Sequence, residues 1–122
     1  MVAQDPFAVA ALRAGSVEAR EPLARTAGQD RWALGELARV IALQDLRPGD
    51  RAEAVELLSR PGRLAGQHQG LYAQLTLASG DRLRTAELLK TLPDIPEPVR
   101  IGLSVDLANP YAGGNGDWGD YA

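Results

Sequence analysis

The single histidine of this 122-residue chain, His68, is the first candidate for acid–base or metal chemistry. A catalytic histidine needs a nucleophile or an orienting carboxylate, and a metal-binding one is helped by a second ligand one helical turn away. His68 lies between Gln67 and Gln69 in a predicted helix, with no histidine or carboxylate four residues to either side. The sequence therefore predicts an exposed histidine at the rim of a helix, without a catalytic or metal-binding role.

Three aspartates, Asp30, Asp50 and Asp81, stand at predicted helix starts. A carboxylate at this place accepts hydrogen bonds from the free N–H groups of the first helical turn. Asp50 and Glu53 also have the spacing of a capping box. We interpret all three aspartates as helix caps and not as acid–base groups.

Other kinds of site lack the residues that they need. Cysteine is absent, which excludes disulfides, thiolate metal sites and cysteine nucleophiles. The run Gly113-Gly114-Asn115-Gly116 has neither the Lys-Ser/Thr ending nor the strand–loop–helix setting of a phosphate loop. We expect no cofactor and no metal.

The charge balance gives no sign of nucleic acid or an anionic membrane as a partner, because 13 basic residues face 16 acidic ones. Twelve of these 13 basic residues are arginine and only Lys90 is lysine, a bias typical of a GC-rich genome. Single arginines therefore receive little functional weight. No secretory signal begins the chain and no apolar run is long enough to span a bilayer, so we expect a cytoplasmic protein.

The elements that position these residues are predicted to be helices. Alanine and leucine dominate a composition that is 45% hydrophobic and 5% aromatic, which favours an all-α fold. Pro22 should kink or shorten the second helix, and the third helix, apolar nearly all round, should be the centrally buried one. The helix expected at 82–92 should face the core with Leu83, Ala86, Leu89 and Leu92. Glycine and proline breaks place the helices at 6–14, 16–27, 31–46, 51–60, 64–78 and 82–92.

The segment 99–107 is ambiguous, because apolar and other residues alternate strictly along it, which on periodicity alone indicates a strand. A lone strand would have no partner in an all-α domain, whereas helical arrays commonly close with an extra helix, and Pro96 or Pro98 suits a helix start. We predict a helix; as a strand, the segment would pair outside this chain. The helical domain then covers 1–108, and 109–122 is expected to be a flexible extension or interdomain linker.

Two turns share a frame that indicates an internal repeat. Gly49-Asp50 and Gly80-Asp81 each join two predicted helices, and Gly15 begins a weaker third copy, with spacings of 34 and 31 residues. Ala42 and Ala73 precede their turn glycines by seven residues. In these features the chain resembles a tetratricopeptide-type repeat over roughly 1–92. The resemblance implies antiparallel helix pairs stacked as a short right-handed superhelix of about seven helices.

The resemblance also implies a site and a function. In that family the first helix of each pair lines a concave groove that binds a protein or peptide, so we expect a non-catalytic scaffold. Three pairs are near the minimum for a stable array, which makes a homodimer an alternative partner. The expected groove residues are Glu36, Arg39 and Leu43 from the middle pair and Gln67, Gly70, Gln74 and Leu77 from the last.

A second, shorter resemblance concerns Val105-Asp106-Leu107-Ala108-Asn109-Pro110-Tyr111. This stretch is similar to the junction between the helical N-terminal region and the catalytic part of some actinobacterial glycosyltransferases. It implies an alternative function, an N-terminal accessory or docking domain of a larger bacterial enzyme with contacts near 103–121. A free-standing enzyme is the least favoured hypothesis.

Overall fold

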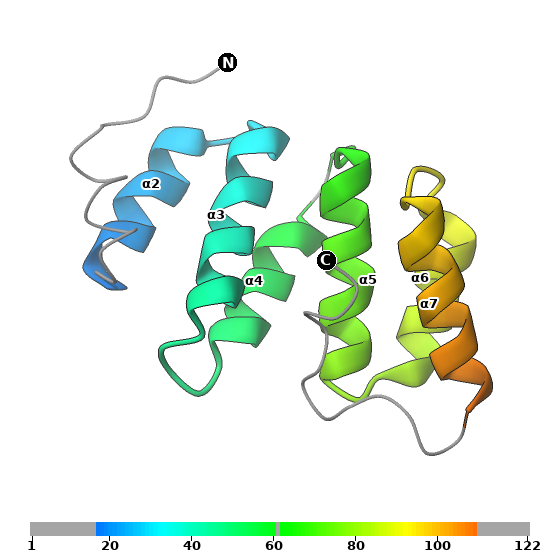
Figure 1. The fold of residues 1–122 in the computed structure, drawn as a ribbon. Helices are drawn as coiled ribbons and strands as arrows, with labels where there is room; N and C mark the ends of the chain where they lie inside the picture. Colours follow the sequence, from blue (N-terminus) through cyan, green and yellow to red (C-terminus); the bar gives the residue numbers. More distant parts are fainter. Residues whose placement is uncertain (1–16, 61, 110–122) are drawn as a thin grey trace. The chain divides into compact units, whose positions relative to one another are not determined.

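The computed structural model describes residues 17–60 and 62–109 (Figure 1). The described residues form helices and no strand, which confirms the all-α prediction for this part of the chain. The helix expected at 6–14 and the extension expected at 110–122 lie outside the described residues. In order the elements are the 3-10 turn η1 (Val17–Ala19) and the helices α2 (Arg20–Ala27), α3 (Arg31–Gln44), α4 (Asp50–Ser59), α5 (Gly66–Ala78), α6 (Arg82–Thr91) and α7 (Glu97–Ala108).

The chain divides into two compact units, residues 1–64 and residues 65–122. The single domain expected over 1–108 stays a prediction. Within the described ranges, no helix combines the length and the apolar character that a membrane crossing requires.

In the first unit α3 packs against both α2 and α4. Leu23, Leu34, Ile41 and Leu58, which come from all three helices, are at most 2% exposed and form the centre of this core. Pro22 is the third residue of α2, where a missing N–H breaks no helical hydrogen bond. The α-helical part begins only two residues before it, after the 3-10 turn, so the helix is shortened as predicted.

Both turn glycines have a positive φ angle. Gly49 has a φ of 94° and Gly80 a φ of 89°, in the left-handed region that other residues rarely adopt. Two of the three predicted aspartate caps are confirmed. Asp30 accepts a hydrogen bond from the N–H of Ala33, and Asp81 accepts one from the N–H of Arg84.

In the second unit α5 packs against α6 and α7. Ala73 and Leu77 of α5 form a buried cluster with Ile95 and with Leu103 of α7. Ten of the 13 residues of α5 are buried, against seven of 14 in α3. The expectation that α3 is the helix buried nearly all round is therefore wrong, and that helix is α5.

The inward face of α6 differs from the prediction. Leu83 is 88% exposed, whereas Thr85 and Leu88 are at most 2% exposed. Leu83 has a helical position from which it points away from α5, while Leu88 completes the buried face and Leu89 packs on the core cluster. The expected placement of Leu83 in the core is wrong.

The ambiguous segment 99–107 belongs to α7, which confirms the predicted helix. Helical geometry separates residues that a strand would place on one face. Leu103 is fully buried, whereas Ile101 and Val105 are 55% and 62% exposed.

Arginines at or near helix starts bind the ends of neighbouring helices in both units. Arg31, the first residue of α3, donates to the carbonyl oxygens of Leu57 and Leu58 in the last turn of α4, at 3.1 and 2.9 Å. Arg82 and Arg100 do the same for α7 and α6. The interpretation of the arginines as a compositional bias alone is incomplete, because these guanidinium groups occupy the free carbonyls that every helix end leaves.

Candidate functional site

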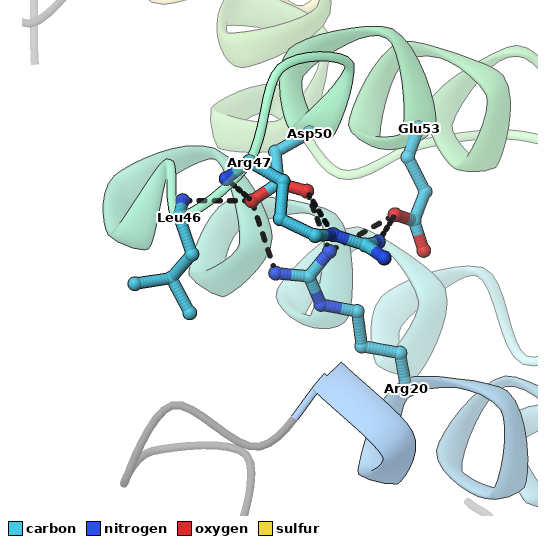
Figure 2. Close-up of polar contacts among 5 residues, drawn as sticks. All are labelled: Arg20, Leu46, Arg47, Asp50 and Glu53. Atoms are coloured by element: carbon cyan, nitrogen blue, oxygen red, sulfur yellow. Dashed lines mark hydrogen bonds and ion pairs between the residues drawn. The ribbon is translucent and has the colours of Figure 1, made fainter.

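A buried polar cluster of the first unit is centred on Asp50 (Figure 2). Asp50, 1% exposed, accepts a bidentate pair from Arg20 of α2, with Nη1–Oδ1 and Nη2–Oδ2 distances of 2.7 and 3.1 Å. Its Oδ2 also accepts the N–H groups of Leu46 and Arg47, at 2.8 and 3.0 Å. Arg47 adds Nε, 3.3 Å from Oδ1, and Glu53 accepts from both arginines. One carboxylate therefore joins α2, the α3–α4 turn and α4.

The electrostatics of this cluster favour the ionised carboxylate. The hydrogen bond from Arg20 lowers the pKa of Asp50 well below its usual range, and the N–H groups of Arg47 and Leu46 act in the same direction, against the effect of burial. The hydrogen bond that Arg20 donates to Asp50 raises the pKa of Arg20, with burial opposing it. Two cations and two anions balance in this network, and the carboxylate of Asp50 stays ionised near neutral pH.

The expected role of Asp50 as a helix cap is wrong. The N-cap of α4 is Gly49, which has no side chain to bind the first turn, and Asp50 is the first helical residue. The N–H of Glu53 donates to the carbonyl of Gly49, so the capping box is also absent. The carboxylate turns instead toward Arg20, 30 residues away in the sequence, because a buried carboxylate is stabilised most by a bidentate guanidinium.

A pocket of about 300 Å³ adjoins this network in the first unit. Its lining contains no residue type that acts as a nucleophile through a hydroxyl, thiol or imidazole. The arginines of the lining are held by carboxylates, since Arg20 and Arg47 bind Glu53, and Arg60 binds Glu56 at 3.1 Å. The lining residues are Val17, Arg20, Glu21, Ala24, Leu37, Arg47, Glu53, Glu56, Leu57 and Arg60.

The histidine prediction is wrong in its location. His68 is fully buried in α5, and not exposed at a rim. Its neighbours Gln67 and Gln69 indicate a polar face, but α5 is covered on most sides, and Gln69 is itself buried and accepts the N–H of Asp94 at 2.8 Å. Within the described ranges, no group of three histidine or carboxylate side chains is placed to hold a metal ion.

The groove residues expected from the middle pair lie together on α3. Arg39 is exposed, Glu36 is partly exposed, and two bonds of 3.2 Å join their side chains. Leu43 is 56% exposed one turn further along the same face. Trp32, 47% exposed, extends this line in the other direction by one turn. We call Trp32, Glu36, Arg39 and Leu43 the α3 face.

The groove residues expected from the last pair are mostly inaccessible. Gly70 is buried, and a Cβ added to it would lie 3.2 Å from Cδ of Pro96 and 3.5 Å from Val99. Leu77 belongs to the core cluster with Leu103. Gln74, which lies one turn after Gly70 and one turn before Leu77, is 4% exposed. Their expected place on an open groove is wrong because α7 and the segment before it cover this side of α5. Of the four, only Gln67 is exposed.

Sequence reasoning missed two residues, Trp32 and Arg20. Trp32 lies in the helix that the sequence predicts to be centrally buried, although its spacing of four and seven residues from Glu36 and Arg39 places it on their face. Arg20 carries no local signal, since its partners are 30 and 33 residues away.

Comparison with known proteins adds no relative to this picture: no family model, no curated protein and no solved structure matches the chain.

Proposed function

We propose that this chain is a non-catalytic, tetratricopeptide-like helical-repeat module that binds a protein or peptide partner through the α3 face. The observation that carries the proposal is the α3 face itself. An exposed tryptophan and an exposed leucine flank an arginine and a glutamate along one side of a single helix. Tryptophan and arginine are enriched in binding hot spots, and two exposed large apolar side chains lie together with an arginine on one face of α3.

The helical hairpins support the repeat part of the proposal. The pairs α3–α4 and α5–α6 are each joined by a turn with a left-handed glycine, Gly49 or Gly80. The small residues Ala42, Ala54 and Ala73 are at most 1% exposed, as the packing of repeat helices requires. A superhelical stack with the α3 face on its concave side remains part of the proposal.

The chemistry of the other polar groups also favours binding over catalysis. The buried carboxylate Asp50 is held by five hydrogen bonds or ion contacts, and each arginine that lines the pocket beside it is paired with a glutamate. A reacting group needs an unshared lone pair or proton at the operating pH, which these paired groups do not offer.

Selection from a displayed peptide library tests the proposal. We expect enriched peptides to bind the chain and to lose at least about tenfold in affinity, or 1.4 kcal/mol, toward the double variant Arg39→Glu, Leu43→Ser. The matched control is Arg60→Glu, which breaks another exposed Arg–Glu pair, at the C-terminal end of α4. Peptides that bind the double variant as well as the wild type, or a library that yields no binder, would contradict the proposal.

A second candidate function, a docking domain of a larger bacterial enzyme, is favoured by α7. Terminal helices of repeat arrays usually present a polar outer face, but Pro98, Ile101, Val105 and Ala108 form an exposed apolar stripe along α7. A glycosyltransferase is the concrete parent that the resemblance at 105–111 indicates. The stripe then packs on the following catalytic part.

The reading frame beyond Ala122 tests this candidate first, because a stop codon directly after Ala122 excludes it. If a catalytic part follows, we expect Ile101→Ser with Val105→Ser to weaken its association with residues 1–122 in a co-expression experiment. The control is Leu83→Ser on α6, a still more exposed leucine outside the stripe.

A further inference from the structure

The four residues of the α3 face have a symmetric order. They lie within an arc of about 60° around the helix axis and extend over about 16 Å along it. An apolar residue stands at each end, Trp32 and Leu43, and the charged pair stands between them. Glu36 and Arg39 are equally far from the two ends, by four residues each.

We propose that the partner of the α3 face is a second copy of this chain, packed antiparallel along α3. The inference rests on the proposed function, since it names the partner of the same face. A twofold axis between Leu37 and Ala38 brings Glu36 opposite the partner's Arg39 and Arg39 opposite the partner's Glu36. The same axis brings Trp32 opposite the partner's Leu43 at both ends. The face is therefore self-complementary, as a twofold interface requires.

Charge selects this arrangement over the alternatives. A parallel pair in register would place Glu36 on the partner's Glu36 and Arg39 on the partner's Arg39, which is repulsive. The internal pair uses Nε and Nη2 of Arg39, so Nη1 can donate to the carboxylate of the second copy without breaking it. Four charges then form one alternating network across the axis, flanked by two contacts between an indole ring and a leucine.

The size of the face determines the strength of association. A single helix face of 14 residues buries less than the roughly 1,200 Å² of a standard stable complex, so the dimer is expected to be weak and concentration-dependent. Since the central contacts are exposed charge pairs, added salt weakens the dimer.

Complementary charge variants test the proposal by sedimentation equilibrium from about 1 μM to 1 mM, the range of weak protein association. Glu36→Arg gives a chain with two cations on the face, and Arg39→Glu gives a chain with two anions. We expect each variant alone to be monomeric, because the twofold axis then opposes like charges. An equimolar mixture of the two is expected to dimerise at least as strongly as the wild type, because every cation then meets an anion.

Folding and location are controlled separately. Both substituted side chains are at least partly exposed, so circular dichroism should show unchanged helicity, and Arg60→Glu should dimerise like the wild type. A wild type that stays monomeric over the whole range overturns the inference, as does a mixture that fails to associate. Single variants that still dimerise overturn it too, since the contact would then lie elsewhere.

The two proposals fail separately. If library peptides bind through Arg39 and Leu43 while the wild type is monomeric, the binding face stands and the second copy is refuted. If the charge-swapped mixture associates, the α3 face is a protein-binding surface and both proposals are supported.

Discussion

Arg82 and Arg100 each cap the helix to which the other belongs. Arg82, the first residue of α6, donates through Nη2 to the carbonyls of Asp106 and Leu107 at the end of α7, at 3.1 and 2.7 Å. Arg100, in the first turns of α7, donates to the carbonyls of Leu89 and Leu92 at the end of α6. The last carbonyls of both antiparallel helices are thereby bound by a guanidinium group. The positive charge of each arginine lies at the negative end of a helix dipole.

Removal of either arginine should destabilise the second unit. We expect Arg82→Met and Arg100→Met each to lower the free energy of unfolding by about 1–3 kcal/mol, because charge-assisted hydrogen bonds to helix-end carbonyls are lost. Lysine at either position should recover only part of this, since a single ammonium does not reproduce the fork of a guanidinium. Urea unfolding monitored by circular dichroism measures the change. Arg25→Met, an exposed control in α2, should stay within about 0.5 kcal/mol of the wild type.

The Arg20–Asp50 pair should show strong coupling. Either Arg20→Met or Asp50→Leu leaves a buried charge without its main partner and is expected to cost about 3–5 kcal/mol. The double variant should cost clearly less than the sum of the two, because no unpaired charge remains. A double-mutant cycle in urea measures the coupling. Additive losses would show that the two side chains act independently, contrary to the bidentate geometry.

The same pair predicts a loss of stability in acid. The pKa of Asp50 in the folded chain lies below its ordinary value of about 4, so the ionised form is favoured by folding. This contribution is fully present above the ordinary pKa and is lost as the pH falls through that value toward the lowered folded-state pKa. Unfolding free energies between about pH 7 and pH 2 should therefore fall more steeply for the wild type than for Asp50→Asn. Parallel pH profiles for the two chains would contradict the prediction.

Two glycines of α5 should respond differently to alanine. A Cβ at Gly66 would lie 2.5 Å from the carbonyl oxygen of Asp94, so the backbone before α7 must move. A Cβ at Gly70 would lie 3.2 Å from Cδ of Pro96, which a small shift relieves. We expect Gly66→Ala to destabilise by about 1–3 kcal/mol. Gly70→Ala should be nearly neutral, because alanine favours the helix by about 1 kcal/mol. Thermal unfolding of both variants shows the order, and a more harmful Gly70→Ala would contradict it.

The features predictable from the sequence are those set by local geometry. Gly49 and Gly80 occupy left-handed turns, and Asp30 and Asp81 cap helices, because each depends on neighbours within a few residues. The helix at 99–107 is predictable in spite of its alternating pattern, because a lone strand would have no partner in an all-α domain. These signals are enough to place the described helices within about two residues at most ends.

The features that sequence reasoning missed depend on tertiary partners. Asp50 has the same local setting as Asp81, yet its carboxylate binds Arg20, and no local rule distinguishes the two. His68 is flanked by glutamines, but the packing around α5 buries it. The groove face of α5 was predicted from repeat register, and α7 covers it because Gly70 admits Pro96 at close range. The shared face of Glu36, Arg39 and Leu43 depends on α3 alone and could be predicted, and its role in binding stays a proposal.

The alternation along α7 has a consequence for misfolding. Once α7 loses its helical hydrogen bonds, the segment 99–107 has the pattern of a strand with five apolar residues on one side, and such segments form intermolecular β-sheets. Arg82 and Arg100 bind the last carbonyls of α7 and α6, which stabilises the helical pair and so opposes this conversion. The double variant Arg82→Met, Arg100→Met should form thioflavin-positive aggregates faster than the wild type under mild denaturation. An equal aggregation rate for the double variant and the wild type would show that the two arginines do not protect against amyloid formation.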